Sequence, residues 1–262
     1  MATEAVGADR ATQVQQFVMH HVQDAPSWHI GPLNIPLPPA LTLHVLMALI
    51  AIAIVFYLFS KLAKHDYNRE APRGLGNALE LLVLFVRDEI CIAYLGKEDG
   101  RRLAPLFLSF FFLILTMNLM GLVPIFATAT SNFNATLALA VMVFFLMTVG
   151  AIQKNGVAGF FQAFIPHGVP LPILFIIFPL ELLGVLIKSG VLALRLFANL
   201  LAGHIALFSI LGLILTYGVA ASPAVLLGLF VFFLEILVSF LQAYIFTMLA
   251  AMFVGQVYHP EH

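Results

Sequence analysis

Long apolar runs separated by short polar or charged segments dominate the chain. The first run covers residues 41–59 and follows a proline-rich stretch, GPLNIPLPPA, that cannot form a helix. Two further runs, 103–126 and 135–152, lie on either side of the polar sequence TATSNFNA. Because about twenty apolar residues cross a bilayer, each run predicts a membrane-spanning helix.

The last third of the chain contains two longer apolar runs, 173–217 and 223–258, which flank the turn GVAAS. As helices rising about 1.5 Å per residue they would reach roughly 50 to 65 Å, against a hydrocarbon core of about 30 Å. Pro179 can kink the first run, but the second has no internal proline. A strongly tilted helical hairpin is therefore predicted.

Charged segments set the expected orientation of these spans. The segment 76–95 mixes apolar residues with four charges and lies between two basic stretches, so we expect an amphipathic helix at the cytoplasmic interface. This arrangement places the N-terminus outside and the C-terminus in the cytoplasm. After Lys154, three prolines interrupt the helical pattern and return the chain to the cytoplasmic side: Pro166, Pro170 and Pro172.

Composition supports a membrane protein throughout. Hydrophobic residues make up 62% of the chain and charged residues 10%, with a mean hydropathy of +1.04. The net charge of −1 gives no indication of nucleic-acid binding, and the single Cys91 cannot form an internal disulfide. The sequence thus predicts an all-α polytopic protein with about five crossing helices, no cleavable signal and no cofactor or metal. Residues 1–40 form an outside N-terminal segment, and 41–262 form one membrane domain.

Arg195 stands out within the long hairpin because no charged residue lies between Lys188 and Glu235 except this arginine. A guanidinium at membrane depth costs a few kcal/mol and cannot lose its proton. Glu181 and Lys188 precede Arg195 at intervals of seven residues, so the three lie on one stripe of a helix. Such a costly, ordered set of charges predicts a functional site.

The second helix of the hairpin repeats this spacing with Glu235 and Gln242. Antiparallel pairing about a turn near residue 219 places three polar pairs level with one another: Arg195 with Gln242, His204 with Glu235, and Glu181 with Gln256. Nine residues separate Arg195 from His204, which puts them on opposite sides of a straight helix. Either the helix bends locally or His204 serves a different face.

These groups suit proton transfer along two separate paths. Glu181 lies toward the cytoplasmic end, whereas His204 and Glu235 lie toward the outside. Carboxylates and imidazoles relay protons, but arginine cannot do so at any reachable pH. Arg195 would block leakage between the paths and attract a carboxylate carried by a partner.

Three motifs carry a family resemblance: RLFANLLAGH, FLEILVSFLQAYIF and NLMGLVPIF. They resemble subunit a of F-type ATP synthases, and the similarity extends over most of the chain. The resemblance implies that Arg195 is the stator arginine and that Glu181 is a channel carboxylate on the cytoplasmic side. It assigns Asn199 and Gln242 as polar neighbours of the arginine in the path, and His204 and Glu235 to the outside half-channel. Lys188, Gln256 and Asn118 are possible further members of the site, although Lys188 is also explained as a snorkelling or phosphate-facing residue.

This chain departs from many bacterial members at two kinds of position. Those members carry Glu at position 204 and His at position 235, so the acid and the imidazole are exchanged here. Some members also carry acidic residues where this chain has Gly121 and Ile125.

The resemblance implies a stator that conducts protons and is not catalytic alone. Its implied partners are a rotor ring of c subunits, peripheral-stalk b subunits, the remainder of the ATP synthase and the bilayer. The implied location is a bacterial plasma membrane, in preference to a mitochondrial inner membrane. Protons and sodium both stay open as coupling ions at this point.

Other interpretations exist for the protein and for its residues. A secondary transporter or free channel is disfavoured because no inverted repeat is evident, and a membrane enzyme with a Glu/His site lacks a motif such as HExxH. His204 and Glu235 could form a neutral pair that fixes helix packing. Arg195 could serve only to bridge helices, Asn199 and Gln242 could be ordinary polar residues that satisfy backbone groups, and Asn118 could bond one helix to another. His44 is expected on the outside surface.

Overall fold

The computed structural model describes residues 12, 27–30, 33–36, 38, 42–63, 74–123, 126, 128–164, 171–217 and 222–259. Almost all of them are helical, in the order α2 (Leu43–Ala63), α3 (Leu75–Phe85), η1 (Val86–Ile92), α4 (Ala93–Gly121), η2 (Ala129–Ser131), α5 (Phe133–Phe145), η3 (Leu146–Gly150), α6 (Ala151–Gln162), α7 (Leu171–Tyr217) and α8 (Ser222–Tyr258). Within the described ranges, five helical segments are long and apolar enough to cross a membrane. The prediction of an all-α polytopic membrane protein is confirmed.

A small strand pair precedes the first span. Strands β1 (Ser27–Ile30) and β2 (Leu33–Pro36) pair in antiparallel register, with Trp28 opposite Ile35. The prolines of this region excluded a helix but did not predict the pairing. Parts of the sequence interpretation fall outside the described residues: most of segment 1–40, the basic stretch 64–73, Pro166 and Pro170, and residues 218–221 of the hairpin turn.

The segment expected at the interface forms α3 and η1 and continues into the first residues of α4. Its buried side includes Val86 and Ile90, whereas Arg87 and Asp88 form an outward-facing ion pair of 2.7 Å, so the segment is amphipathic. The chain then turns sharply at Gly96, whose φ of 77° suits glycine. The following helix packs against η1.

A second glycine ends the third apolar segment. Helix α5 begins after Asn132, whose side chain accepts a hydrogen bond of 2.9 Å from the Asn134 amide. The helical path runs through η3 into α6 and breaks at Gly156, where φ is 74°. The helix therefore extends beyond the predicted limit at residue 152, and it keeps Lys154 and Asn155 in helical conformation.

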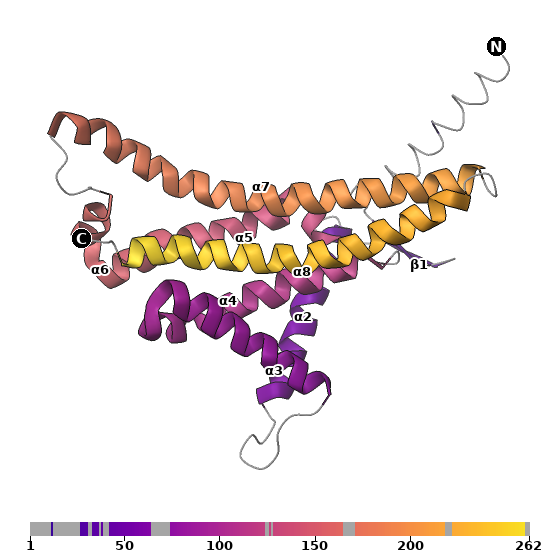
Figure 1. Cartoon of the computed structure of the whole chain (residues 1–262), viewed down its shortest axis with the longest axis horizontal. Coiled ribbons are helices and arrows are strands. Elements are labelled where there is room, and N and C mark those ends of the chain that lie inside the picture. Colours follow the sequence, from indigo (N-terminus) through magenta and orange to yellow (C-terminus); the bar gives the residue numbers. More distant parts are fainter. Residues whose placement is uncertain are drawn as a thin grey trace.

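Helices α7 and α8 form the predicted long hairpin and lie side by side along the longest axis of the molecule (Figure 1). They contain 47 and 37 residues. At about 1.5 Å per residue they measure roughly 70 and 55 Å, so both exceed the membrane core and must tilt to cross it. Helix α7 continues through Pro179.

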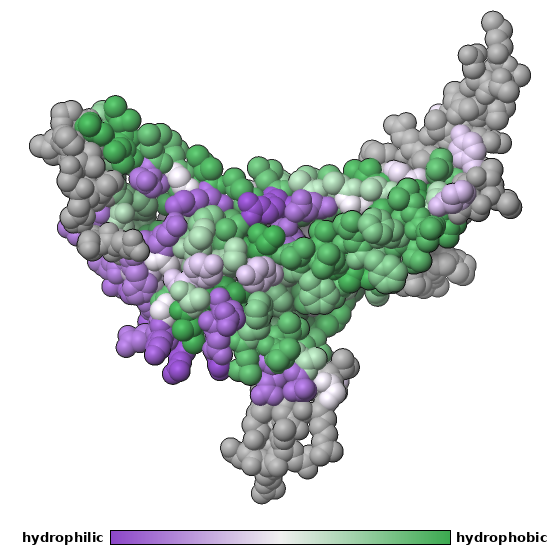
Figure 2. All heavy atoms as spheres, in the orientation of Figure 1, coloured by the Kyte–Doolittle hydropathy of each residue, from purple (hydrophilic) through white to green (hydrophobic). Residues whose placement is uncertain are grey.

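The other spans pack beneath this hairpin. Helix α8 contacts α4 on one side and α7 on the other, α5 contacts α7, and α2 packs on α4. Phe107, Ile114 and Phe246 are fully buried in the shared core. Figure 2 shows apolar residues over much of the outer face of α7 and α8, with polar residues gathered near the start of α4. An apolar exterior of this kind suits lipid contact.

Candidate functional site

A strip of polar residues interrupts the apolar surface in the middle of α7 (Figure 2). Lys188 and Arg195 are half-buried, and Glu181 and Asn199 are exposed. These exposures agree with the seven-residue stripe inferred from the sequence. The strip lies on α7, the longest described helix. Each of its polar side chains occupies a position where an apolar side chain would contact lipid.

The charge of Arg195 is not paired within the described part of the chain. Across the described residues, its guanidinium forms no hydrogen bond and no ion pair with any carboxylate. Leu194 and Val191, on the outward side of the same helix, are exposed. The cation is therefore available to a group brought by another molecule at this face.

Asn199 and Gln242 link the two helices directly. The Asn199 Nδ2 atom donates to Gln242 Oε1 at 2.9 Å, and Gln242 is buried. The register proposed from the sequence placed Gln242 level with Arg195, and the hydrogen bond shows instead that it pairs with Asn199, one turn further along. Gln242 Nε2 is buried and has no partner within the described part of the chain.

His204 and Glu235 meet as the register predicts. His204 Nδ1 lies 3.2 Å from Glu235 Oε1, and the two residues are 5% and 7% exposed. His204 Nδ1 also lies 2.9 Å from the Leu200 carbonyl oxygen. His204 is buried while Arg195 is half-exposed, so the two occupy different faces of α7, one of the two solutions that their nine-residue spacing allowed.

Gly203 makes this contact possible. A Cβ atom at position 203 would lie 2.5 Å from Glu235 Oε1. The carboxylate therefore packs against the bare backbone of α7, beside the imidazole. Glu235 Oε2 is buried and has no partner among the described residues, so one carboxylate oxygen stays available for a proton or a water molecule.

The cytoplasmic-side pairing differs from the sequence register. Lys188 Nζ donates to Gln256 Oε1 at 3.0 Å, so Gln256 pairs with Lys188 and not with Glu181. From His204 to Lys188 helix α7 advances 16 residues, while its partners on α8 advance 21 residues from Glu235 to Gln256. The two helices cross at an angle, and the paired side chains differ in length. The register between them is therefore not constant along the hairpin.

Asn118 bonds one helix to another. Its Nδ2 atom donates to the Ser239 carbonyl oxygen on α8 at 3.5 Å, and its Oδ1 atom accepts from Thr130 at 2.8 Å. The residue is fully buried. These contacts describe a packing role.

Comparisons with known proteins agree with the motifs. The family model described as ATP synthase A chain matches residues 45–255. The chain belongs to this family. Among curated proteins named ATP synthase subunit a, that of Myxococcus xanthus is 38% identical over 92% of this chain and 88% of its own length. The subunits of Chloroherpeton thalassium and Pelodictyon phaeoclathratiforme are 40% and 37% identical, over 93% and 100% of this chain and 77% and 82% of their own lengths.

The sequence did not predict three polar residues near the buried imidazole of His204: Thr128, Ser131 and His44. Thr128 and Ser131 belong to the polar break between two spans, which was interpreted only as a turn. His44, expected on the surface, is 4% exposed and lies 3.3 Å from Ser131 Oγ through its Nε2 atom. The signal was a run of hydroxyl residues, TATS, but the position of this turn beside α7 depends on tertiary packing.

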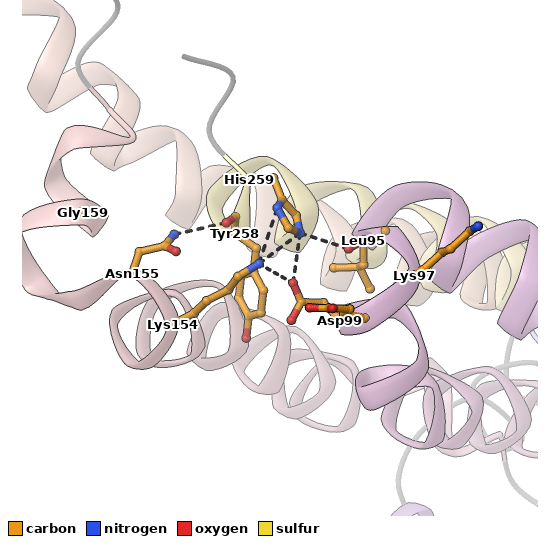
Figure 3. Close-up of a pocket in the computed structure, with 10 residues that line it drawn as sticks. Leu95, Lys97, Asp99, Lys154, Asn155, Gly159, Tyr258 and His259 are labelled. Atoms are coloured by element: carbon orange, nitrogen blue, oxygen red, sulfur yellow. Dashed lines mark hydrogen bonds and ion pairs between the residues drawn. The ribbon is translucent and has the colours of Figure 1, made fainter.

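A separate polar cluster joins the far end of α8 to α4 and α6 (Figure 3). Lys154 contacts Asp99, and His259 Nε2 lies 3.0 Å from both Asp99 Oδ2 and the Leu95 carbonyl oxygen. Asn155 donates to the Val257 and Tyr258 carbonyl oxygens at 3.2 Å. We call Asp99, Lys154 and His259 the terminal cluster. It borders a cavity of about 750 Å³ that Lys97 and Glu98 also line, so acids and bases balance there. It is best explained as an anchor for α8.

Proposed function

We propose that this chain is the proton-translocating stator of a rotary F-type ATP synthase, in which Arg195 separates two offset half-channels. Family membership supports the general role, because the relatives above are named ATP synthase subunit a. The assignment of individual residues rests on the geometry of α7 and α8. Protons are the coupling ion in this proposal.

The observation that carries the proposal is the unpaired charge of Arg195. A half-buried guanidinium with no carboxylate partner in the described chain is costly at membrane depth. A rotor carboxylate that passes this face would lower that cost when it is ionised. It would therefore release its proton as it approaches Arg195, and the permanent charge would prevent protons from passing directly between the paths.

The outside path ends at His204 and Glu235. An imidazole accepts a proton at one nitrogen and releases one from the other, and the adjacent carboxylate can take that proton. The 3.2 Å contact supports this direction of transfer, as does Glu235 Oε2, which has no hydrogen-bond partner among the described residues. Asn199 and Gln242 then continue the polar surface between Glu235 and Arg195.

The cytoplasmic path begins at the other end of the polar strip. Glu181 is exposed on α7, and the Lys188 to Gln256 hydrogen bond lies between it and Arg195. In this proposal Glu181 accepts protons that the rotor releases after nearly a full rotation. Because moving one charge across 100 mV yields only about 2.3 kcal/mol, several protons are needed per nucleotide and none can leak.

The partners follow from this role. A rotor ring of c subunits would face the polar strip of α7, and b subunits and the remaining synthase would complete the stator. The membrane would be a bacterial plasma membrane, with the N-terminus outside and the C-terminus in the cytoplasm.

A secondary transporter that uses the same hairpin is the second candidate function. Copurification distinguishes the stator from the transporter. A rotor ring with a soluble ATPase head supports the stator, and a lone active protein supports the transporter.

The direct test is Arg195→Ala in the assembled complex. We expect loss of ATP-driven proton pumping and of coupled ATP synthesis, with normal insertion of the subunit. Arg87→Ala is the control, because Arg87 lies on η1 and pairs with the neighbouring Asp88. Coupled synthesis at the normal rate in Arg195→Ala would contradict the proposal.

A further inference from the structure

The hydroxyl of Thr128 contacts the imidazole of His204 from outside the hairpin. Thr128 Oγ1 lies 2.6 Å from His204 Nε2, and Thr128 is 4% exposed. The same nitrogen lies 3.0 Å from the Gly121 carbonyl oxygen. The imidazole is thus held at both nitrogens, by Glu235 on one side and by the break between α4 and α5 on the other.

Gly121 provides the space that this hydroxyl occupies. A Cβ atom at position 121 would lie 2.2 Å from Thr128 Oγ1 and 2.8 Å from Thr128 Cβ. No side chain can therefore stand at position 121 while Thr128 keeps its place. The hydroxyl fills the volume beside His204 that a residue at position 121 would otherwise take.

The polar groups continue past Thr128 toward the first span. Ser131 Oγ donates to the Thr128 carbonyl oxygen at 2.8 Å and lies 3.3 Å from His44 Nε2. With the serine proton engaged in this way, His44 Nε2 is the donor in the second contact. His44 is buried on the first turn of α2. Buried hydroxyls and imidazoles in an apolar protein are costly unless they are satisfied or used.

The surroundings of His44 contain little else that titrates. Helix α2 packs against α4, η2 and α5, and residues 103–150 contain no Asp, Glu, Lys, Arg or His. The charges of α4 lie at its opposite end, before residue 103. Among the described residues, the titratable groups connected to His44 through Ser131 and Thr128 are His204 and Glu235.

We propose that His44, Ser131 and Thr128 form the outer part of the proton-entry path and deliver protons to His204 Nε2. This inference rests on the proposed function. His44 Nδ1 is buried, so in this path it receives a proton relayed from the outside water, and His44 Nε2 releases one to Ser131 Oγ. Ser131 would then pass its own hydroxyl proton to a bridging water molecule, and the Thr128 hydroxyl would donate its proton to His204 Nε2 as it receives one from that water. His204 then releases the Nδ1 proton to Glu235. The transfer leaves His44 and His204 in the opposite tautomer and Glu235 protonated, so Glu235 passes its proton to the rotor carboxylate and both imidazoles return to the starting tautomer before the next proton enters.

The test uses the assembled complex in proteoliposomes, with proton uptake driven by an imposed pH gradient. Thr128→Val keeps the shape of the side chain and removes the hydroxyl, and we expect proton entry to fall about tenfold. Thr128→Ser should retain most of the rate. Thr136→Val is the matched control, because Thr136 is also buried and its hydroxyl donates to the nearby Phe133 carbonyl oxygen, its one recorded partner among the described residues. Equal rates for Thr128→Val and Thr136→Val would overturn the proposal.

A pH profile separates transfer from simple positioning of His204. We expect His44→Gln, which keeps a donor toward Ser131 but cannot titrate, to flatten the dependence of proton entry on outside pH. An unchanged profile would remove His44 from the path.

A second variant is needed if Thr128→Val fails to assemble. Gly121→Ala then tests the same contact, because the added Cβ displaces the Thr128 hydroxyl without removing it. A normal rate of proton entry in Gly121→Ala would overturn the role of Thr128. Loss of coupling in Arg195→Ala together with normal Thr128→Val would refute only the outer path. Normal coupling in Arg195→Ala would refute the proposed function itself.

Discussion

At the scale of single residues, the most consequential contact is between His204 and Glu235. Both are buried in an apolar protein, and their ring and carboxylate atoms lie 3.2 Å apart. Helix α7 carries the imidazole and helix α8 carries the acid. In the proposed function the pair needs one acid and one imidazole, whichever helix carries each.

The exchanged double mutant tests this interpretation. We expect His204→Glu and Glu235→His each to slow proton entry, and the double exchange to recover more than either single change, because an acid again faces an imidazole. Contacting residues couple by about 0.5–3 kcal/mol, so a double-mutant cycle on uptake rates should be clearly non-additive. Additive free energies would show that the two residues do not share a path.

Gly203→Ala tests the same contact from the backbone side. The added Cβ would lie 2.5 Å from Glu235 Oε1, so the carboxylate must move away from the imidazole. We expect proton entry to decrease on the order of tenfold, equivalent to about 1.4 kcal/mol of barrier. Gly190→Ala is the control on the same helix, since nothing lies within 4 Å of its added Cβ. Equal uptake rates in the two variants would show that the position of this carboxylate is unimportant.

At the scale of elements, the hairpin is held at its far end by close backbone contact and by the terminal cluster. A Cβ at Gly255 would lie 2.3 Å from the Tyr94 carbonyl oxygen, so glycine lets α8 approach the helix before the Gly96 turn. Asp99 and Lys154 come from α4 and α6, and His259 follows α8 directly. Three elements separated in sequence are thereby fixed to one another.

Asp99→Ala should loosen this end of α8 without affecting proton transfer. Exposed ion pairs contribute about 0.2–1 kcal/mol, and we expect hydrogen exchange of the amides near Tyr258 to accelerate about two- to fivefold. Lys97→Ala is the control, because the exposed Lys97 side chain points away from the cluster in Figure 3. Unchanged exchange in Asp99→Ala would show that packing alone anchors the helix.

At the scale of the whole molecule, the two ends of the proposed path lie far apart on one helix. Glu181 and His204 are 23 residues apart on α7. At about 1.5 Å per residue this separation is roughly 35 Å, close to the thickness of the hydrocarbon core. Arg195 lies between them, so each path needs to cover only part of the membrane.

Accessibility from the two sides tests this arrangement. In a Cys91→Ser background, we expect aqueous thiol reagents to reach Gly184→Cys from the cytoplasm and Ser209→Cys from outside. Position 184 has open space beside Glu181, and Ser209 lies just beyond His204 on α7. The measurement is the labelling rate of each cysteine, with the reagent added to one side of the membrane at a time. Labelling of both cysteines from both sides would indicate one continuous channel.

The sequence alone determined the helical spans, the long hairpin and the position of Arg195, because hydropathy and charge spacing are local properties of the chain. The sequence also predicted the His204 and Glu235 pair, because antiparallel pairing about a turn near residue 219 brings these two positions level.

Only the tertiary structure decided the pairs further from the turn. Gln242 bonds Asn199 and Gln256 bonds Lys188, because crossing helices lose a fixed register with distance from their turn. It alone also brought Thr128 to His204 and buried His44, since the placement of a short turn against a distant helix depends on how α4, α5 and α2 pack together.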